Sequence, residues 1–226
     1  MSFNWCLEGT AADTSLLLDH LPSYVFPRNA HMISDNIILG VSLGGHSAWQ
    51  CIFHEQRFKA AVIVIGCPDY IRLMSHRAQM SSLDSWCGST PPGANFLGSD
   101  DFPSSLVDAV GKGDPAGLSL GTTPEKNILR DPKSRALQDL LRKCIAGKKI
   151  LVISGAADTL VPYSCAKPFM EMLKNQIATD DHLIMSKTQI EDVIFPNTGH
   201  TMSEQMVQRA VNFIIDKMLL SSNNEY

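Results

Sequence analysis

The stretch Ile37–Trp49 reads IILGVSLGGHSAW and decides how the rest of the chain is interpreted. It opens with a short apolar run that a glycine stops, which is typical of a buried strand. The residues after Leu43 have the spacing of apolar positions that is typical of a helix. At the junction lies Gly40-Val41-Ser42-Leu43-Gly44, a match to the pattern G-x-S-x-G.

A second match, at residues 117–121, raises the question of which serine could be a nucleophile. An activated hydroxyl needs a sharp strand-to-helix turn, where a helix N-terminus and free backbone N–H groups face the charge that develops on a substrate. Ser42 has a strand before it and a helix after it, and Gly40 and Gly44 remove side chains where backbones are expected to crowd. Ser119 has no apolar run on either side and is expected in a flexible loop. We therefore favour Ser42, with a glycine-rich turn of an ordinary β-α-β unit as the alternative.

Helical and strand patterns alternate along the chain. Apolar residues recur at helical spacing in residues 11–25, where Leu16, Leu17 and Leu21 form the predicted apolar face. Strands are predicted at residues 36–42, 60–70, 148–155 and 191–197, with helices between them. A strand, a helix and a strand in succession form a β-α-β unit, so the order predicts a mostly parallel sheet.

These elements predict one α/β domain over residues 1–226, with the three-layer α/β/α architecture. Residues 70–133 interrupt the alternation, because they are rich in Gly, Pro and Ser and contain only helical fragments. The segment is too long for a connecting loop and predicts a lid-like insertion.

The last helix is predicted from Thr201 onward. Thr201 and Glu204 have the spacing of a capping box, in which each side chain bonds a free backbone N–H at the start of the helix. The predicted apolar face of this helix consists of Met206, Ala210, Phe213, Ile214 and Met218.

Two residues that could activate a serine follow later predicted strands. A serine hydroxyl is a poor nucleophile until a histidine takes its proton and a carboxylate holds that histidine in the right tautomer. Asp158 lies in ILVISGAADTLVP just past one strand, and His200 lies in VIFPNTGHTM between the last strand and the last helix. Because the strands of a parallel sheet end at one edge, we expect both side chains near Ser42.

With three motifs together, the chain resembles the α/β-hydrolase family. The motifs are G-x-S-x-G-G after one strand, G-x-x-D-x-x-V-P after a later strand, and G-H before the terminal helix. The resemblance implies a serine hydrolase that acts on a carboxylic ester or related small-molecule acyl substrate, without a metal or cofactor. It implies Ser42 as the nucleophile, His200 as the general base and Asp158 as its orienting acid. The backbone N–H of Leu43 is the implied oxyanion donor.

A closer similarity is carried by the segment LGVSLGGHSAW, which is similar to fungal α/β-hydrolase-like proteins. Some of those proteins accompany secondary-metabolite pathways. The similarity implies a role in fungal secondary metabolism.

The chain departs from the family at its N-terminus, where it begins at about the helix that precedes the nucleophile strand. The missing part would supply the second oxyanion donor, and no H-G-G-G or similar segment occurs in the sequence. Losing one such donor costs about 10²–10³ in rate, so poor catalysis is expected. The absent strands also leave one edge of the strand at residues 36–42 uncovered. We expect a homodimer or a partner chain to cover it, with a shortened gene product of poor solubility as the alternative.

Composition and charge exclude several classes of partner. The 226 residues carry a net charge of -4 without a run of Lys or Arg, so neither nucleic acid nor a membrane surface is an expected partner. The longest apolar run, around AAVIVIGC, is far too short to cross a bilayer, and no signal peptide is recognisable. The six cysteines are scattered without zinc-site spacing, which favours free thiols in a reducing compartment. We expect a soluble, cytoplasmic protein.

Several alternatives stay open on the sequence. A non-catalytic binding or regulatory domain would keep the turn at Ser42 without an oxyanion loop. A non-hydrolytic enzyme of natural-product biosynthesis would use His200 as the base for cyclisation or elimination. Asp69 is the alternative acid, although an Asp after Pro is more often a turn or cap residue. We expect His46 to pack or hydrogen-bond within its own helix and Cys67 to be a core thiol.

Overall fold

The computed structural model of the chain describes residues 3–26, 28, 31, 33–122 and 134–222. At its centre is a four-stranded parallel sheet with the strand order β1-β2-β3-β4. The strands are β1 (Asn36–Val41), β2 (Phe58–Val64), β3 (Lys149–Gly155) and β4 (Gln189–Phe195). Because all four strands run the same way, the loops that follow them leave from one edge of the sheet.

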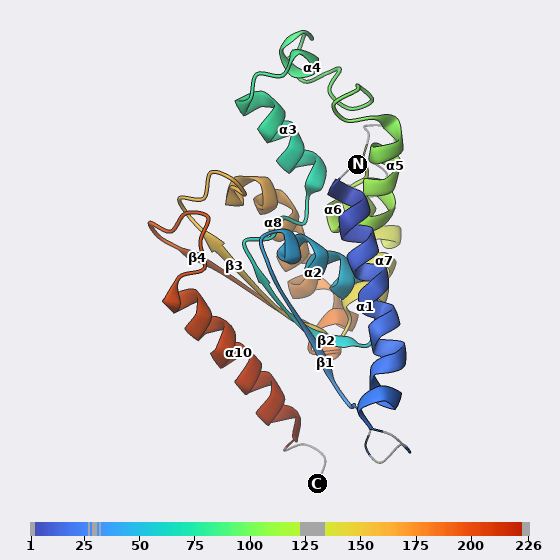
Figure 1. The fold of residues 1–226 in the computed structure, drawn as a ribbon. Coiled ribbons are helices and arrows are strands. Elements are labelled where there is room, and N and C mark those ends of the chain that lie inside the picture. The colour runs from blue at the N-terminus through green and yellow to red at the C-terminus, as the bar shows by residue number, and fades with distance from the viewer. Residues whose placement is uncertain (1–2, 27, 29–30, 32, 123–133, 223–226) are drawn as a thin grey trace.

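Helices cover both faces of this sheet (Figure 1). The helices of one face are α2 (Leu43–His54), α7 (Arg135–Ile145) and α8 (Tyr163–Thr179), with α1 (Phe3–Val25) packed on α2 and α9 (Asp181–Met185) following α8. The rings of Trp49 on α2 and Phe169 on α8 meet edge to face, with centroids 5.7 Å apart. The opposite face is covered by α10 (Glu204–Ser222). The predicted α/β fold with three layers and a parallel sheet is confirmed.

The two central strands form the core of the protein. Val62 and Ile63 of β2 lie in register with Leu151 and Val152 of β3, and all four side chains are buried. Successive side chains of a strand point to opposite faces, so both faces of these strands are covered. Full burial of each such side chain contributes about 1.5–3 kcal/mol to stability.

The terminal helix α10 has a different cap from the predicted one. It begins at Glu204, and the Oγ of Ser203 accepts a hydrogen bond from the Met206 N–H at 3.3 Å. The predicted capping box is therefore wrong, since Thr201 is exposed and lies before the helix. The buried members of the predicted apolar face are Met206, Ala210 and Phe213. The side chain of Met218 lies outside the described residues.

The first helix, α1, is longer than predicted and packs differently. It begins at Phe3 rather than near residue 11. Leu16 and Leu17, two residues of the predicted apolar face, are 54% and 56% exposed, and Leu18 packs against the core instead. That part of the prediction is wrong because successive helical residues point in different directions, so Leu16 and Leu17 face away when Leu18 faces the core.

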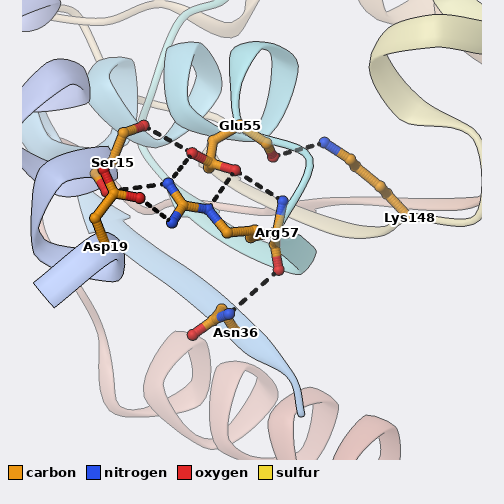
Figure 2. A network of polar contacts seen from close by, with 6 residues as sticks. All are labelled: Ser15, Asp19, Asn36, Glu55, Arg57 and Lys148. Carbon is orange, nitrogen blue, oxygen red and sulfur yellow. Dashed lines mark hydrogen bonds and ion pairs between the residues drawn. The ribbon is translucent and has the colours of Figure 1, made fainter. Parts of the chain in front are cut away.

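A polar network around Arg57 ties α1 to the end of α2 and the start of β2 (Figure 2). The Arg57 guanidinium lies 2.7 Å from the Glu55 carboxylate and 2.5 Å from that of Asp19 on α1. The Ser15 hydroxyl of α1 donates to Glu55 at 2.9 Å. Hydrogen bonds from Arg57 lower the pKa of Glu55 to about 2. Because solvent screens the exposed Arg57 side chain, each ion pair contributes little to stability, and the network mainly fixes where α1 lies.

Between β2 and α7 the chain forms a second group of helices. They are α3 (Tyr70–Met80), α4 (Asp84–Cys87), α5 (Ser104–Gly113) and α6 (Pro115–Leu120). These helices enclose a hydrophobic cluster of their own, with buried residues that include Tyr70, Phe96 and Phe102. The Asp114 carboxylate accepts hydrogen bonds from the N–H groups of Tyr70 and Gly117, which joins α3 to α6. The lid role of residues 70–133 stays a prediction, and residues 123–133 lie outside the described part of the chain.

Strand β1 forms one edge of the sheet. Within the ranges given above, no strand pairs with its outer side. The side chain of Leu39 on this strand is 48% exposed. The expectation that a second copy or a partner chain covers this edge stays a prediction.

Three findings bear on compartment and cofactors, and each refers only to the described residues. Five cysteines are free thiols: Cys51, Cys67, Cys87, Cys144 and Cys165. The side chain of Cys6 lies outside the described residues. None of the helices described combines the length and apolar character needed to cross a membrane. No group of three or more His, Cys, Asp or Glu residues there is arranged to hold a metal ion.

Lys148 is a buried cation at the amino edge of the sheet, opposite the loops that follow the strands. It is 2% exposed, and its Nζ donates to the carbonyls of Ile52 at 2.6 Å and Glu55 at 3.0 Å (Figure 2). Burial lowers the pKa of Lys148 to about 8, from 10.5. Between these two pH values the unfolded chain binds more protons than the folded chain. The free energy of unfolding therefore rises with pH in this window, by at most about 1.4 kcal/mol per pH unit from this group.

We expect Lys148→Met to flatten the rise in the free energy of unfolding between pH 8 and pH 10.5, because the titrating group is gone. Urea unfolding at several pH values measures this slope. The control is Lys143→Met, which removes an exposed lysine of α7 and should keep the wild-type slope. An unchanged slope in Lys148→Met would show that this lysine has an ordinary pKa in the folded chain.

Candidate active site

Ser42 lies in the sharp turn between β1 and α2. Its backbone has φ 54° and ψ -114°, a conformation that residues other than glycine rarely adopt. The Ser42 N–H donates to the Val64 carbonyl of β2 at 2.9 Å, which holds the turn against the neighbouring strand. The serine therefore lies at the carboxyl edge of the sheet, directly before the N-terminus of a helix.

Glycines permit this turn, although not at every predicted position. A Cβ on Gly40 would lie 2.0 Å from the carbonyl oxygen of Gly44, and a Cβ on Gly45 would lie 2.8 Å from the carbonyl oxygen of Val64. A Cβ on Gly44 would meet nothing within 4 Å. The predicted crowding at Gly44 is wrong, because its carbonyl faces Gly40 while its own Cα faces open space. Gly40 and Gly45 are the positions that require glycine.

Three predicted residues meet within hydrogen-bond distance of one another. The Oγ of Ser42 is 2.9 Å from Nε2 of His200, and Nδ1 of His200 is 2.9 Å from Oδ2 of Asp158. When Asp158 is ionised, Nδ1 of His200 carries the proton and donates it to the carboxylate. The lone pair of Nε2 is then left to accept the Ser42 hydroxyl proton, as a general base must.

The Asp158 carboxylate is fixed by contacts on both of its oxygens. Its side chain has no exposed surface. Its Oδ1 accepts hydrogen bonds from the backbone N–H groups of Leu160 and Val161, each at 2.9 Å. Its Oδ2 is the partner of His200, whose side chain keeps 27% of its surface exposed. The buried charge is therefore fully hydrogen-bonded, and the histidine that it orients stays open to solvent.

Leu43, the predicted source of an oxyanion donor, is the first residue of α2. The first four N–H groups of a helix have no partner inside the helix, and the N-terminus carries a partial positive charge. The Leu43 N–H belongs to this set and follows Ser42 directly. It can therefore hydrogen-bond an oxygen that becomes negative near the serine. The Leu43 side chain is 44% exposed.

Ser119, the serine of the second G-x-S-x-G match, lies in α6 rather than in the predicted flexible loop. Its side chain is fully buried, and its Oγ has no hydrogen-bond partner among the described residues. The loop prediction is wrong because Asp114 and Pro115 form a helix start. The Asp114 carboxylate caps the Gly117 N–H, and Pro115 occupies the first helical position, where no N–H is needed.

Asp69, the alternative acid, is the N-cap of α3. Its carboxylate accepts the N–H of Arg72 at 2.9 Å and lies 3.4 Å from the Arg72 guanidinium. His46 is buried in α2, and its Nδ1 lies 2.9 Å from the carbonyl oxygen and 3.0 Å from the backbone nitrogen of Cys67, which follows β2, so this contact is not within the helix as predicted. Burial lowers the pKa of His46, which favours a neutral ring. Asp69 therefore has the contacts of a helix cap, and His46 has those of a packed side chain.

One residue beside the site, Arg77, was not predicted from the sequence. It lies in α3, and its Nη2 donates to the Leu160 carbonyl at 3.0 Å. Leu160 is two residues after Asp158 in the same loop. No local pattern in the sequence indicates Arg77, because Arg77 and Leu160 are brought together only by the packing of α3 against this loop.

Comparisons with known proteins return structural similarity alone. No family model and no curated protein sequence matches the chain. A structure of a SOBER1 variant from Arabidopsis thaliana matches with 12% identity over 94% of this chain and 64% of that chain, at a TM-score of 0.47. The acylaminoacyl peptidase of Pyrococcus horikoshii matches with 15% identity over 85% of this chain and 24% of that chain, at 0.43. Esterase PE8 matches with 14% identity over 91% of this chain and 61% of that chain, at 0.42.

This chain thus spans less than two thirds of the length of each of these three proteins. Their identities are below 25% and their TM-scores are below 0.5. Neither an activity nor a substrate carries over from them to this chain.

We expect Gly40→Ala to destabilise the protein by about 1–3 kcal/mol or more, because the new methyl group would overlap the Gly44 backbone and force β1 and α2 apart. Urea unfolding measures the change. The matched control is Gly44→Ala, which adds the same methyl group four residues away in open space and should gain up to about 1 kcal/mol of helix propensity. Equal stability of the two variants would contradict the close contact at Gly40.

Proposed function

We propose that this chain is a serine hydrolase of the α/β-hydrolase type. Its proposed substrate is a carboxylic ester or a related small-molecule acyl compound, which it cleaves through an acyl-enzyme. The hydrogen-bonded series from Ser42 through His200 to Asp158 carries this proposal. A single G-x-S-x-G match is weak support, whereas three residues from three separate loops in this geometry are much more specific.

In the proposed reaction, Ser42 Oγ attacks the carbonyl carbon of the ester while Nε2 of His200 takes the hydroxyl proton. The resulting tetrahedral intermediate carries a negative charge on the former carbonyl oxygen. Its collapse breaks the ester C–O bond, and the alcohol leaves with the proton that His200 returns. Water, activated by His200, then attacks the acyl-enzyme and releases the carboxylic acid and free Ser42.

The N-terminus of α2 supports the proposed intermediate. The Leu43 N–H and the partial positive charge of the helix end both favour a negative oxygen beside Ser42. The sequence holds no H-G-G-G segment for a second donor. We therefore expect turnover about 10²–10³ lower than that of an enzyme with two donors.

Two finer assignments belong to the same proposal. The free thiols of Cys51, Cys67, Cys87, Cys144 and Cys165 support a reducing compartment, and we propose the cytoplasm. The resemblance of LGVSLGGHSAW to fungal proteins of the family supports a role in secondary metabolism.

A fluorophosphonate probe, which labels activated serines, should label the wild-type chain and Ser119→Ala but not Ser42→Ala. The reason is that Ser42 has a histidine 2.9 Å from its hydroxyl, whereas Ser119 is buried. Mass spectrometry of the labelled peptide identifies the modified serine. A label on Ser119 would refute the assignment, and an unlabelled wild-type chain would favour the non-catalytic alternative.

We expect Asp158→Asn to lower the turnover of 4-nitrophenyl butyrate by about 10⁴, because the amide no longer holds His200 in the tautomer that accepts a proton. Absorbance of released 4-nitrophenol measures the rate. Asp69→Asn is the control and should keep the rate within a few fold, since Asp69 caps α3. If Asp69→Asn abolished turnover and Asp158→Asn did not, the acid would have to be reassigned.

A further inference from the structure

We infer that Arg77 forms a subsite for a carboxylate group, so the substrate is an ester that carries a free carboxylate besides its scissile bond. This inference rests on the proposed hydrolase function and names the chemical class of its substrate. It follows from the position of the Arg77 guanidinium beside the loop of Asp158, from the lack of an anionic partner for it among the described residues, and from the exposed apolar surface of Leu160 next to it.

The guanidinium lies directly against the loop that holds the catalytic acid. Its Nη2 donates to the Leu160 carbonyl at 3.0 Å, and the N–H of the same residue donates to Asp158 at 2.9 Å. Burial is the largest cause that lowers the pKa of His46 in α2, and the positive charge of Arg77 adds to it. Arg77 therefore lies against the acid loop, and its charge reaches α2, the helix that begins after Ser42.

Among the described residues Arg77 forms no ion pair with a carboxylate, and unlike Arg28 and Arg135, which also form none there, it is partly buried rather than exposed. The arginines that form ion pairs with carboxylates are Arg57, Arg72, Arg142 and Arg209. Arg77 is partly buried and, within the described part of the chain, bonds only a backbone carbonyl. Its Nε is buried without any hydrogen-bond partner there. A partly desolvated cation without an anion is costly, and a bound anion would remove that cost.

The free donors of the guanidinium define how an anion would bind. Nε is covered by protein, whereas Nη1 has no partner in the described residues and is not among the buried unpartnered atoms. Nη2 keeps a second N–H beside the one that it gives to Leu160. The donors left to a ligand are thus the N–H groups of Nη1 and the remaining N–H of Nη2. Two such donors on one guanidinium can bind the two oxygens of a carboxylate.

A carboxylate fits this subsite better than a phosphate does. The neighbouring cation on α3, Arg72, is already paired with Asp69, so a single guanidinium is available and balances a single negative charge. Leu43 and Leu160, each next to a site residue or its loop, are 44% and 50% exposed. Their apolar surface suits an aliphatic spacer between the scissile carbonyl and the carboxylate. A monoester of a short dicarboxylic acid combines these features.

The test compares two esters that differ only in the terminal group of the acyl chain. We expect Arg77→Gln to lower kcat/KM for mono-4-nitrophenyl glutarate by about 10- to 100-fold, mainly through KM, because a charged hydrogen bond is lost. The same variant should change kcat/KM for 4-nitrophenyl butyrate less than about threefold. Arg77→Lys should recover part of the loss, and Arg72→Gln, a matched change on the same helix, should leave the ratio of the two esters unchanged.

A third ester, 4-(butyryloxy)benzoate, places the carboxylate on the leaving group. A selective loss in Arg77→Gln for either charged ester supports the inference and tells which side of the scissile bond bears the charge. An equal loss for charged and neutral esters would overturn it, because Arg77 would then only position the acid loop. Unchanged kinetics for all three esters would overturn it as well.

Binding without turnover separates this inference from the proposed hydrolysis. In Ser42→Ala, calorimetric titration should detect monomethyl glutarate with at least tenfold higher affinity than methyl butyrate, and the additional change Arg77→Gln should abolish that difference. Arg77-dependent binding in Ser42→Ala, together with a wild-type chain that shows no esterase activity, would leave the subsite standing and refute the hydrolase. No preference for the charged ligand would refute the subsite, whatever the esterase activity.

Discussion

The contact between Gly40 and the Gly44 carbonyl is the constraint on which the rest of the site depends. An added Cβ would stand 2.0 Å from that oxygen, so only glycine allows α2 to begin directly at the end of β1. Gly45 and Gly66 approach one another in the same way where α2 crosses the loop after β2. The positive φ of Ser42 persists because these backbone contacts leave the chain no other path.

The parallel sheet then brings distant loops to that turn. The loops after β3 and β4 leave the same edge as Ser42, and they carry Asp158 and His200. Since β2 lies between β1 and β3, the helix that follows β2 begins in the middle of this edge. The helix α3 therefore begins beside the loop that follows β3, and it places Arg77 against the loop of Asp158.

The two edges of the sheet carry different kinds of polar contact. The carboxyl edge holds a buried carboxylate aimed at a histidine, together with an arginine that lacks an anion in the described structure. At the amino edge, Lys148 and the Arg57 network bond to α1 and to the end of α2 (Figure 2). Contacts at the amino edge fix the positions of the helices. Because the helices are fixed, the carboxyl edge can hold the strained backbone of Ser42 and the guanidinium of Arg77, which has no anion among the described residues.

Local chemistry was readable in the sequence. Apolar runs ended by glycine predicted the strands, and the strand-to-helix context favoured Ser42 as the nucleophile. Residues that follow parallel strands lie at one edge of the sheet, so Asp158 and His200 were expected near Ser42. Long-range packing was not readable. The exposure of Leu16, the burial of Ser119 and the partners of Arg77 depend on elements far away in the chain. Periodicity and turn chemistry act over a few residues, so the layers and the three converging loops could be predicted from local sequence. Which side chains are buried and which charges meet depends on contacts between distant segments, and these exist only in the folded chain.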